Sequence, residues 1–370
     1  MNEKLKTIVF VQTQAENAGA QEISRQLANG VKAKGWGARQ IFLFRRTDSF
    51  DHEEDTFFCA NERPSSIYGL LSLMFRLFFD LRRVEPDAIV TFQHFGNLIA
   101  APIARLAGVR LIVANQVSAP RTVAPAVRFV DKVIGCFGAY DHIVVNSAVT
   151  ETDYERYPSA YSCRLVRIDH GFLDKSATLE KSAARRALGL PEAVELLGCA
   201  ARLHPLKQLD LAIRVLTVNS KQHLALAGQG QDRARLETMA RELGVAERVH
   251  FCDELGGEAM GAFLAAIDCF VFPSAAETFG LAPVEAAQAG VPVVANDLDA
   301  LRDTLAVESE PCALFVDASD TQSFAAAVRR VFDDDTLTSA LSARGLRLVD
   351  RFPLDKMVGA YLNLIEAKPA

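Results

Sequence analysis

The sequence predicts an α/β protein of two domains, each a doubly wound parallel sheet with helices on both faces. Its 370 residues exceed what one hydrophobic core usually serves. Short apolar runs alternate with helical stretches, which is the pattern of parallel sheets. The alternation stops in a polar, irregular segment at residues 169–182 and then resumes. We therefore expect the chain to divide within that segment.

The first predicted domain covers residues 1–176. Its apolar runs predict strands at 7–12, 39–44, 88–92, 110–114 and 142–146, with a helix at 21–34 after the first of them. Open sheets of this kind bind ligands outside the carboxyl ends of their strands. The residues that follow each strand are therefore the first candidates for function.

The second predicted domain covers residues 177–353. Its strands are expected at 196–201, 223–228, 248–251, 269–273, 292–296 and 313–316. The remaining segment, 354–370, has helical apolar spacing. We expect it to form a helix that packs back on the first domain.

The charge and the cysteine content of the sequence indicate which kinds of partner and which compartment to expect. Residues 1–176 carry 21 Lys and Arg against 19 Asp and Glu, and residues 177–370 carry 19 against 27. Neither half is basic enough for nucleic-acid binding, although the first is compatible with an anionic acceptor or membrane surface. The seven cysteines are scattered without a CxxC spacing, and the chain opens on a strand-like run. Both features favour a cytoplasmic protein with reduced thiols.

The motif ETFGLAPVE, residues 277–285, directly follows a predicted strand and its turn. It places Glu277 in a turn and Glu285 on the next helix, whose N-terminus offers free backbone N–H groups. Carboxylates and turn amides together suit a polyol ligand that carries phosphates. The alternative is a pair of surface acids near a helix start.

Arg202 and Lys207 leave the end of the strand at 196–201. A bidentate guanidinium and a point-charge ammonium at one strand end can clamp a diphosphate. The alternative is that both side chains are solvated. A GxG at residues 228–230 follows the next strand and is by itself only a turn signal.

These motifs resemble those of the retaining glycosyltransferases of family 4, which have the GT-B fold, two Rossmann-like domains that face a cleft. The resemblance covers nearly the whole chain and is strongest from residue 196 to residue 303. It implies that Glu277 contacts the transferred sugar. The backbone of Phe279, Gly280 and Leu281 would hold the remaining sugar hydroxyls, and Glu285 would bind the ribose of the nucleotide.

The resemblance also indicates which residues bind the phosphates of the donor. It implies that Arg202 and Lys207 bind the diphosphate and stabilise its departure, so that they count with Glu277 as catalytic residues. Leu255 and its backbone would lie against the nucleotide base. Gly19, the one glycine retained from the family's Gly-Gly loop, would approach the donor phosphates.

The sequence departs from the family at three places. Asp253 stands where members often have glycine, and the glycine loop is reduced. Asn115 and Gln116 stand at the strand end where many members place a histidine close to the reacting sugar. An amide donates and accepts hydrogen bonds but takes no proton, so these two residues and His94 are candidates for the acceptor or sugar side. The alternative for His94 is a structural histidine.

The resemblance implies a metal-independent, retaining hexosyltransferase. The donor would be a nucleotide-diphosphate sugar and the acceptor a hydroxyl of a glycan, a lipid-linked or a small molecule, in bacterial polysaccharide or glycolipid biosynthesis. No HExxH or CxxC predicts a metal, and neither a metal nor a cofactor is expected. One alternative is a catalytically silent nucleotide-sugar-binding subunit. Another is a nicotinamide-dependent dehydrogenase, but its GxGxxG is missing after the first strand.

An apolar stretch at residues 67–79 contains Arg76 and is followed by Arg82 and Arg83. It is too short for a membrane span. It predicts either a buried helix or a surface that contacts an apolar acceptor or a membrane. In the second case the protein would be cytoplasmic with a peripheral contact to the inner face of the membrane.

Overall fold

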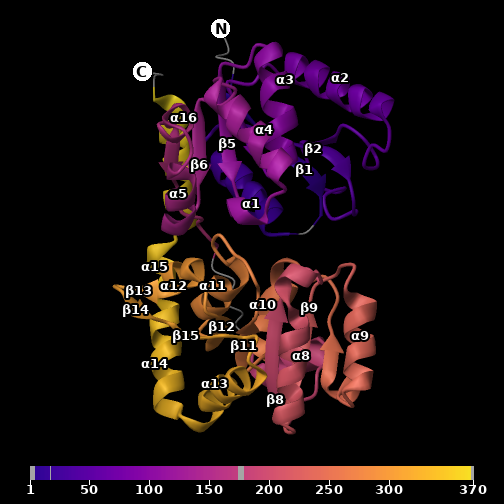
Figure 1. Ribbon diagram of the computed structural model, residues 1–370, viewed down its shortest axis with the longest axis vertical. Helices are drawn as coiled ribbons and strands as arrows, with labels where there is room; N and C mark the ends of the chain where they lie inside the picture. The colour runs from indigo at the N-terminus through magenta and orange to yellow at the C-terminus, as the bar shows by residue number, and fades with distance from the viewer. Residues whose placement is uncertain (1–4, 17, 174–178, 368–370) are drawn as a thin grey trace. The chain divides into compact units, whose positions relative to one another are not determined.

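The computed structural model describes residues 5–16, 18–173 and 179–367. The chain forms two compact units (Figure 1). Unit 1 comprises Met1–Phe172 and Phe352–Ala370, and unit 2 comprises Leu173–Arg351. The predicted boundary between residues 176 and 177 lies outside the described residues.

Unit 1 is built on a parallel sheet of order β3-β2-β1-β4-β5-β6-β7. Its strands are β1 (Thr7–Ala15), β2 (Gly37–Arg45), β3 (Thr56–Phe58), β4 (Ala88–Phe92), β5 (Leu111–Gln116), β6 (His142–Val145) and β7 (Leu165–Arg167). The strand order reverses between β1 and β4, so the carboxyl ends of these two strands form the topological switch point. The sequence did not predict the short strands β3 and β7.

Helices cover both faces of this sheet. They are α1 (Gly19–Ala33), α2 (Ile67–Val84), η1 (Gly96–Ala100), α3 (Ala101–Leu106), η2 (Pro120–Thr122), α4 (Pro125–Cys136), α5 (Ala148–Glu155), α6 (Ser159–Ser162) and α16 (Leu354–Glu366). Val9 and Val11 belong to the core that includes α2 and α3. Their neighbours Ile8 and Phe10 are equally buried. Because successive strand residues point to opposite faces, both faces of β1 are covered.

The last helix, α16, belongs to unit 1. It packs on α1, where a side-chain carbon on Gly30 would meet Val358 at 2.4 Å. The Tyr361 hydroxyl donates a hydrogen bond to Oδ1 of Asn115 at the end of β5. The last helix thus packs against α1 and β5 of the same unit.

Unit 2 repeats the same topology with the order β10-β9-β8-β11-β12-β15. Its strands are β8 (Glu195–Ala200), β9 (Gln222–Ala227), β10 (Val249–Phe251), β11 (Cys269–Phe272), β12 (Val293–Asn296) and β15 (Ala313–Val316), with a hairpin of β13 (Ala306–Val307) and β14 (Glu310–Pro311). Its helices are α7 (Lys181–Ala187), η3 (Pro205–Lys207), α8 (Leu209–Val218), α9 (Arg233–Glu242), η4 (Ala246–Arg248), α10 (Gly257–Ala266), α11 (Leu281–Gln288), α12 (Asp299–Thr304), α13 (Thr321–Asp333), α14 (Asp335–Leu346) and α15 (Leu348–Arg351). The predicted class of two Rossmann-like parallel-sheet domains is confirmed.

The switch point of unit 2 lies between β8 and β11, which pair side by side. The connection after β8 carries Arg202 and Lys207, and the connection after β11 carries Glu277. The fold therefore brings these two predicted motifs to one place. Within the described parts of the chain, no helix has both the length and the apolar character that crossing a bilayer requires.

Candidate functional site

Lys207 and Glu277 form an ion pair at the switch point of unit 2. Nζ of Lys207 lies 2.5 Å from Oε1 of Glu277. The side chains are only 20% and 12% exposed. The two residues are 70 positions apart, and each follows the carboxyl end of one of the paired strands. The structure thus joins two motifs that the sequence presents separately.

The two connections that carry this pair are also joined through their backbones. The Ala275 N–H donates to the Leu206 carbonyl over 2.9 Å. The turn η3 begins where His204 accepts a hydrogen bond from the Leu206 N–H over 3.2 Å. The backbone of Lys207 is therefore held on a short, hydrogen-bonded turn.

The surroundings of the pair are apolar on the inner side. Nζ of Lys207 lies 5.4 Å from the ring centroid of Phe272. Behind it, burial raises the pKa of the Cys199 thiol to about 12, with a smaller opposing effect from the Lys207 charge. Partial burial strengthens the field of a cation. The site can therefore attract an anion at Lys207 and accept hydrogen bonds from hydroxyl groups at Glu277.

Helix α11 starts next to this pair. Gly280, which precedes it, has φ of +80°, and a side-chain carbon there would meet Leu301 at 2.3 Å. Thr304 donates to the Phe279 carbonyl over 2.7 Å and fixes the turn from the other side. Only glycine fits this backbone easily. The turn leads into the first helical residue, Leu281, and places Glu285 one turn further along the helix.

The glycines at 228 and 230 support the Arg202 loop. A side-chain carbon on Gly228 would lie 2.0 Å from the Ala201 carbonyl oxygen, and one on Gly230 would lie 2.2 Å from that of Leu203. The Leu203 N–H donates to the Gln229 carbonyl over 2.9 Å. The sequence indicated only a turn here. The structure shows two loops in backbone contact with the exposed Arg202 between the contact points.

Asp253 stands where family members often have glycine, and its backbone conformation explains that preference. Asp253 has φ of +54°, in the left-handed region that glycine adopts most easily. Its carbonyl accepts from the Gly228 N–H over 2.6 Å, and its carboxylate pairs with Arg233 over 2.8 Å. Leu255 follows, half-buried, between β10 and α10.

Asn115 and Gln116 are engaged inside unit 1. Both are at most 2% exposed. Asn115 donates to the Thr91 carbonyl over 3.3 Å and accepts from Tyr361. Gln116 donates to Asp131 over 3.1 Å. These hydrogen bonds link β5 to β4, α4 and α16. The sequence did not predict this structural role.

Asp131 is the centre of this buried network. It accepts hydrogen bonds from Tyr140 and Tyr161, each over 2.8 Å, besides that from Gln116. Burial raises the pKa of the Asp131 carboxyl, while these three hydrogen bonds oppose the rise. No sequence spacing indicated this group, because its partners lie on separate segments.

His94 and Gly19 follow β4 and β1 at the switch point of unit 1. The connection after β4 is tied to β1, since the Gly96 N–H donates to Thr13 Oγ1 over 3.1 Å. His94 is half-buried, and this burial lowers its pKa. Gly19 is exposed as the first residue of α1. Their roles in binding stay predictions.

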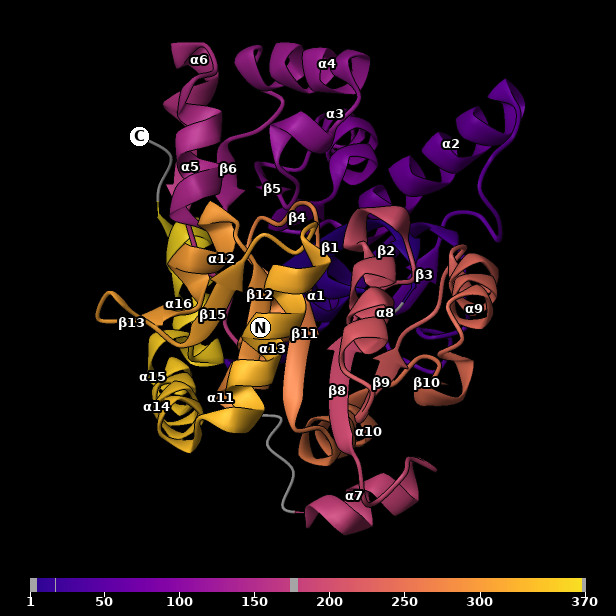
Figure 2. The same cartoon turned by 60° about the horizontal axis from the view of Figure 1, so that its bottom comes forward.

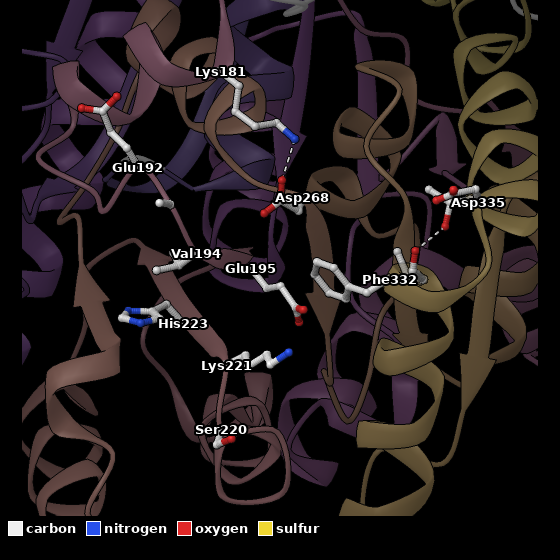
Figure 3. Close-up of a pocket in the computed structure, with 13 residues that line it drawn as sticks. Lys181, Glu192, Val194, Glu195, Ser220, Lys221, His223, Asp268, Phe332 and Asp335 are labelled. Carbon is white, nitrogen blue, oxygen red and sulfur yellow. Dashed lines mark hydrogen bonds and ion pairs between the residues drawn. The ribbon is translucent and has the colours of Figure 1, made fainter.

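An open hollow of about 850 Å³ lies at the opposite, amino-terminal end of the unit 2 sheet (Figure 3). It is lined by the first residue of β8, Glu195, together with His223 of β9 and Asp268 before β11. Asp268 pairs with Lys181 over 2.5 Å. The hollow is thus separated from Lys207 and Glu277 by the length of β8 and β11.

The chain has two units, each with a parallel sheet of the same strand order. This architecture defines a class, the GT-B fold. The crystal structure of HepE from Anabaena with UDP and glucose is similar over 98% of this chain and 99% of that one, with a TM-score of 0.83 and 18% identity. Sucrose-phosphate synthase from Thermosynechococcus elongatus is similar over 97% and 98%, with a TM-score of 0.82 and 21% identity. At these identities the likeness shows the fold.

Part of the chain is also similar in sequence to known proteins. Residues 180–347 match the family of glycosyl transferases group 1. A D-inositol 3-phosphate glycosyltransferase of Stackebrandtia nassauensis is 33% identical over 206 residues, which are 51% of this chain and 46% of that protein. The lipopolysaccharide core biosynthesis mannosyltransferase LpsB of Rhizobium meliloti is 30% identical over 198 residues, 51% and 56% of the two chains. The chain thus spans about half the length of the curated relatives it matches.

Proposed function

We propose that this chain is a retaining, metal-independent glycosyltransferase of family 4 that transfers a hexosyl group from a nucleotide-diphosphate sugar to an acceptor hydroxyl. The observation that carries the proposal is the Lys207–Glu277 ion pair at the β8–β11 switch point. It combines a shielded cation for a diphosphate with a carboxylate for sugar hydroxyls. The match of residues 180–347 to the group 1 family supports this assignment.

The reaction breaks the bond between the anomeric carbon and the donor phosphate. Negative charge grows on the leaving diphosphate while the sugar acquires oxocarbenium character. In our proposal Lys207 and Arg202 stabilise the diphosphate. Glu277 exchanges its bond to Lys207 for bonds to the sugar, and the departing phosphate takes the proton of the acceptor hydroxyl on the same face. This route yields retention without a protein base.

The start of α11 supplies further contacts to the donor. In our proposal the backbone of Phe279, Gly280 and Leu281 binds sugar hydroxyls, and Glu285 binds the ribose. Leu255 lies against the base. Asn115 and Gln116 have internal partners, so in our proposal they support the acceptor side within unit 1.

We propose a glycan, lipid-linked or small-molecule acceptor, as in bacterial polysaccharide or glycolipid biosynthesis. Two matching relatives are named for D-inositol 3-phosphate and for lipopolysaccharide core biosynthesis, which supports an acceptor of these classes. The donor engages unit 2 and the acceptor engages unit 1 near His94. The protein would act in the cytoplasm, and no cofactor or metal takes part.

A thermal-shift screen with UDP-, GDP-, ADP- and TDP-sugars tests the donor. A ligand at 100 times its dissociation constant stabilises the folded state by about 2.7 kcal/mol. UDP-glucose comes first because a protein of the same fold has been solved with it. NMR of the first-formed product then gives the anomer. An inverted product, or activity lost with EDTA and restored by magnesium, contradicts the proposal.

A nicotinamide dinucleotide added to the screen, together with a donor-hydrolysis assay, separates the rival functions. A silent binding subunit would be stabilised by a nucleotide-sugar but would neither transfer nor hydrolyse it over long incubation. A dehydrogenase would be stabilised by a nicotinamide dinucleotide instead. We expect donor hydrolysis without an acceptor and faster turnover with one.

A further inference from the structure

Helix α2 has an apolar face that no described residue of the chain covers. Its inner face packs into the core of unit 1 through Leu73, Leu77 and Leu81. On the opposite side lie Ile67, Tyr68, Leu71, Phe75 and Phe79, which are between 44% and 82% exposed. We call these five side chains the α2 stripe. In Figure 2, α2 lies on the outer side of unit 1, beyond α3.

The α2 stripe is unusual for the outer face of a globular helix. Such faces are normally polar, and a row of large exposed apolar side chains marks an interaction surface. The prediction that this segment is simply a buried helix is therefore wrong for these five residues. Folding holds the helix in place independently of any partner, because its inner face is packed and its first turn is capped by Ser66.

The exposed charges of α2 are cationic. Arg82 and Arg83 are exposed, and Arg76, also exposed, donates to the Cys59 carbonyl over 3.2 Å. The one acid of the helix, Asp80, is half-buried and interacts with Arg76 and Arg83. A cationic, apolar surface is complementary to anionic phospholipid, since arginine binds headgroup phosphates while apolar side chains enter the acyl boundary.

The surface continues beyond α2. The Arg82 guanidinium lies near Gly108, just after α3. Leu106, the last residue of α3, is 77% exposed. Apolar side chains and arginines thus alternate across neighbouring helices. A flat protein partner would need acids opposite these arginines, whereas a bilayer supplies both chemistries at once.

We propose that the α2 stripe docks unit 1 onto the surface of an anionic phospholipid bilayer. The helix lies in the plane of the membrane, with Phe75 and Phe79 below the headgroups and Arg82 and Arg83 at the phosphates. This inference does not depend on the proposed transferase activity, because it concerns a separate surface of the protein.

Co-sedimentation of the full chain with phosphatidylcholine vesicles, with and without phosphatidylglycerol, tests the proposal at low salt. The parent should sediment with the anionic vesicles and stay in the supernatant with the neutral ones. The double variant Phe75→Ser, Phe79→Ser should bind the anionic vesicles at least about tenfold more weakly, because it lacks the two rings that enter the membrane. Its control is Leu346→Ser, an exposed leucine of α14 in unit 2.

The charge contribution is tested with Arg82→Glu, Arg83→Glu. We expect binding to anionic vesicles to weaken about 25-fold or more, since each basic residue contributes about fivefold near such a surface. The variant Arg214→Glu, Arg330→Glu makes the same change of net charge on exposed positions of unit 2. Circular dichroism confirms that each variant is folded.

Three outcomes would overturn the proposal. The parent could stay in the supernatant with anionic vesicles, or Leu346→Ser could weaken binding as much as the stripe variant does. Sedimentation velocity could also show a dimer that Phe75→Ser, Phe79→Ser dissociates, and the occupant of the stripe would then be a second copy of the chain.

Discussion

At the scale of the residue, Lys207 has two tasks. It neutralises a carboxylate that is only 12% exposed, and in the proposed reaction it stabilises the leaving diphosphate. Lys207→Ala and Arg202→Ala should each lower kcat about a hundredfold, because a charge-stabilising donor is worth about 3 kcal/mol in the transition state. Steady-state kinetics with the donor found in the screen measure the effect.

The two variants should differ in stability. Lys207→Ala leaves Glu277 without its cation and should cost about 1 to 3 kcal/mol in urea unfolding. Arg202 is exposed, so its replacement should cost little. Lys221→Ala, an exposed lysine beside the hollow of unit 2, is the control for both measurements. Full activity of Arg202→Ala would remove it from the phosphate site.

His170 makes the stability of the protein depend on pH. It is 4% exposed and bonded to Asn146 over 3.0 Å, and burial lowers its pKa to about 3. The unfolded chain protonates a histidine near pH 6.5, so the unfolded state binds more protons below that pH. Stability contributed by the neutral ring is present above pH 6.5 and is lost as the pH falls, by about 1.4 kcal/mol per unit.

His170→Gln should therefore show a flatter pH dependence of urea unfolding below pH 6.5 than the parent, although it starts from lower stability. His52→Gln, at an exposed position, accounts for the loss of one histidine. Parallel curves for His170→Gln and the parent would show that protonation of this ring does not limit acid stability.

At the scale of the element, apolar periodicity predicted every long strand in both sheets. The strands β3, β7, β13 and β14 escaped prediction because segments of two or three residues seldom form an apolar pattern, although β10, which also has three residues, was predicted. Strand ends likewise located Lys207 and Glu277, since parallel strands bring their carboxyl ends to one edge. The Asp131 network could not be predicted, because Tyr161 and Gln116 meet it only through the tertiary fold.

The contact between the loops after β8 and β9 gives a prediction for Gly228. Gly228→Ala places a carbon 2.0 Å from a carbonyl oxygen, so the Arg202 loop must shift. We expect a loss of about 1 to 3 kcal/mol in unfolding free energy together with lower kcat/KM. Gly244→Ala is the matched control, because Gly244 also has a positive φ but has open space around it. If both variants lose the same unfolding free energy, backbone strain and not the contact between the loops causes the loss.

At the scale of the whole molecule, unit 1 is discontinuous in sequence and unit 2 is continuous. A chain truncated after residue 352 lacks α16 and its bond from Tyr361 to Asn115. Hydrogen exchange should then show lower protection in α1 and β5, which α16 supports, and unchanged protection in β8 and β11. Loss of protection throughout would mean that the two units unfold as one.

The same arrangement sets an order of events during synthesis on the ribosome. Unit 2 is made as one uninterrupted stretch, and all of its residues precede α16 in the chain. Unit 1, although made first, has to wait with the α1 surface and the Asn115 amide uncovered until the final helix is released. Domains usually complete their folding from the N-terminal end of a nascent chain. Here the first half would be finished last, so an early stop in translation would leave an incomplete first domain beside a finished second one.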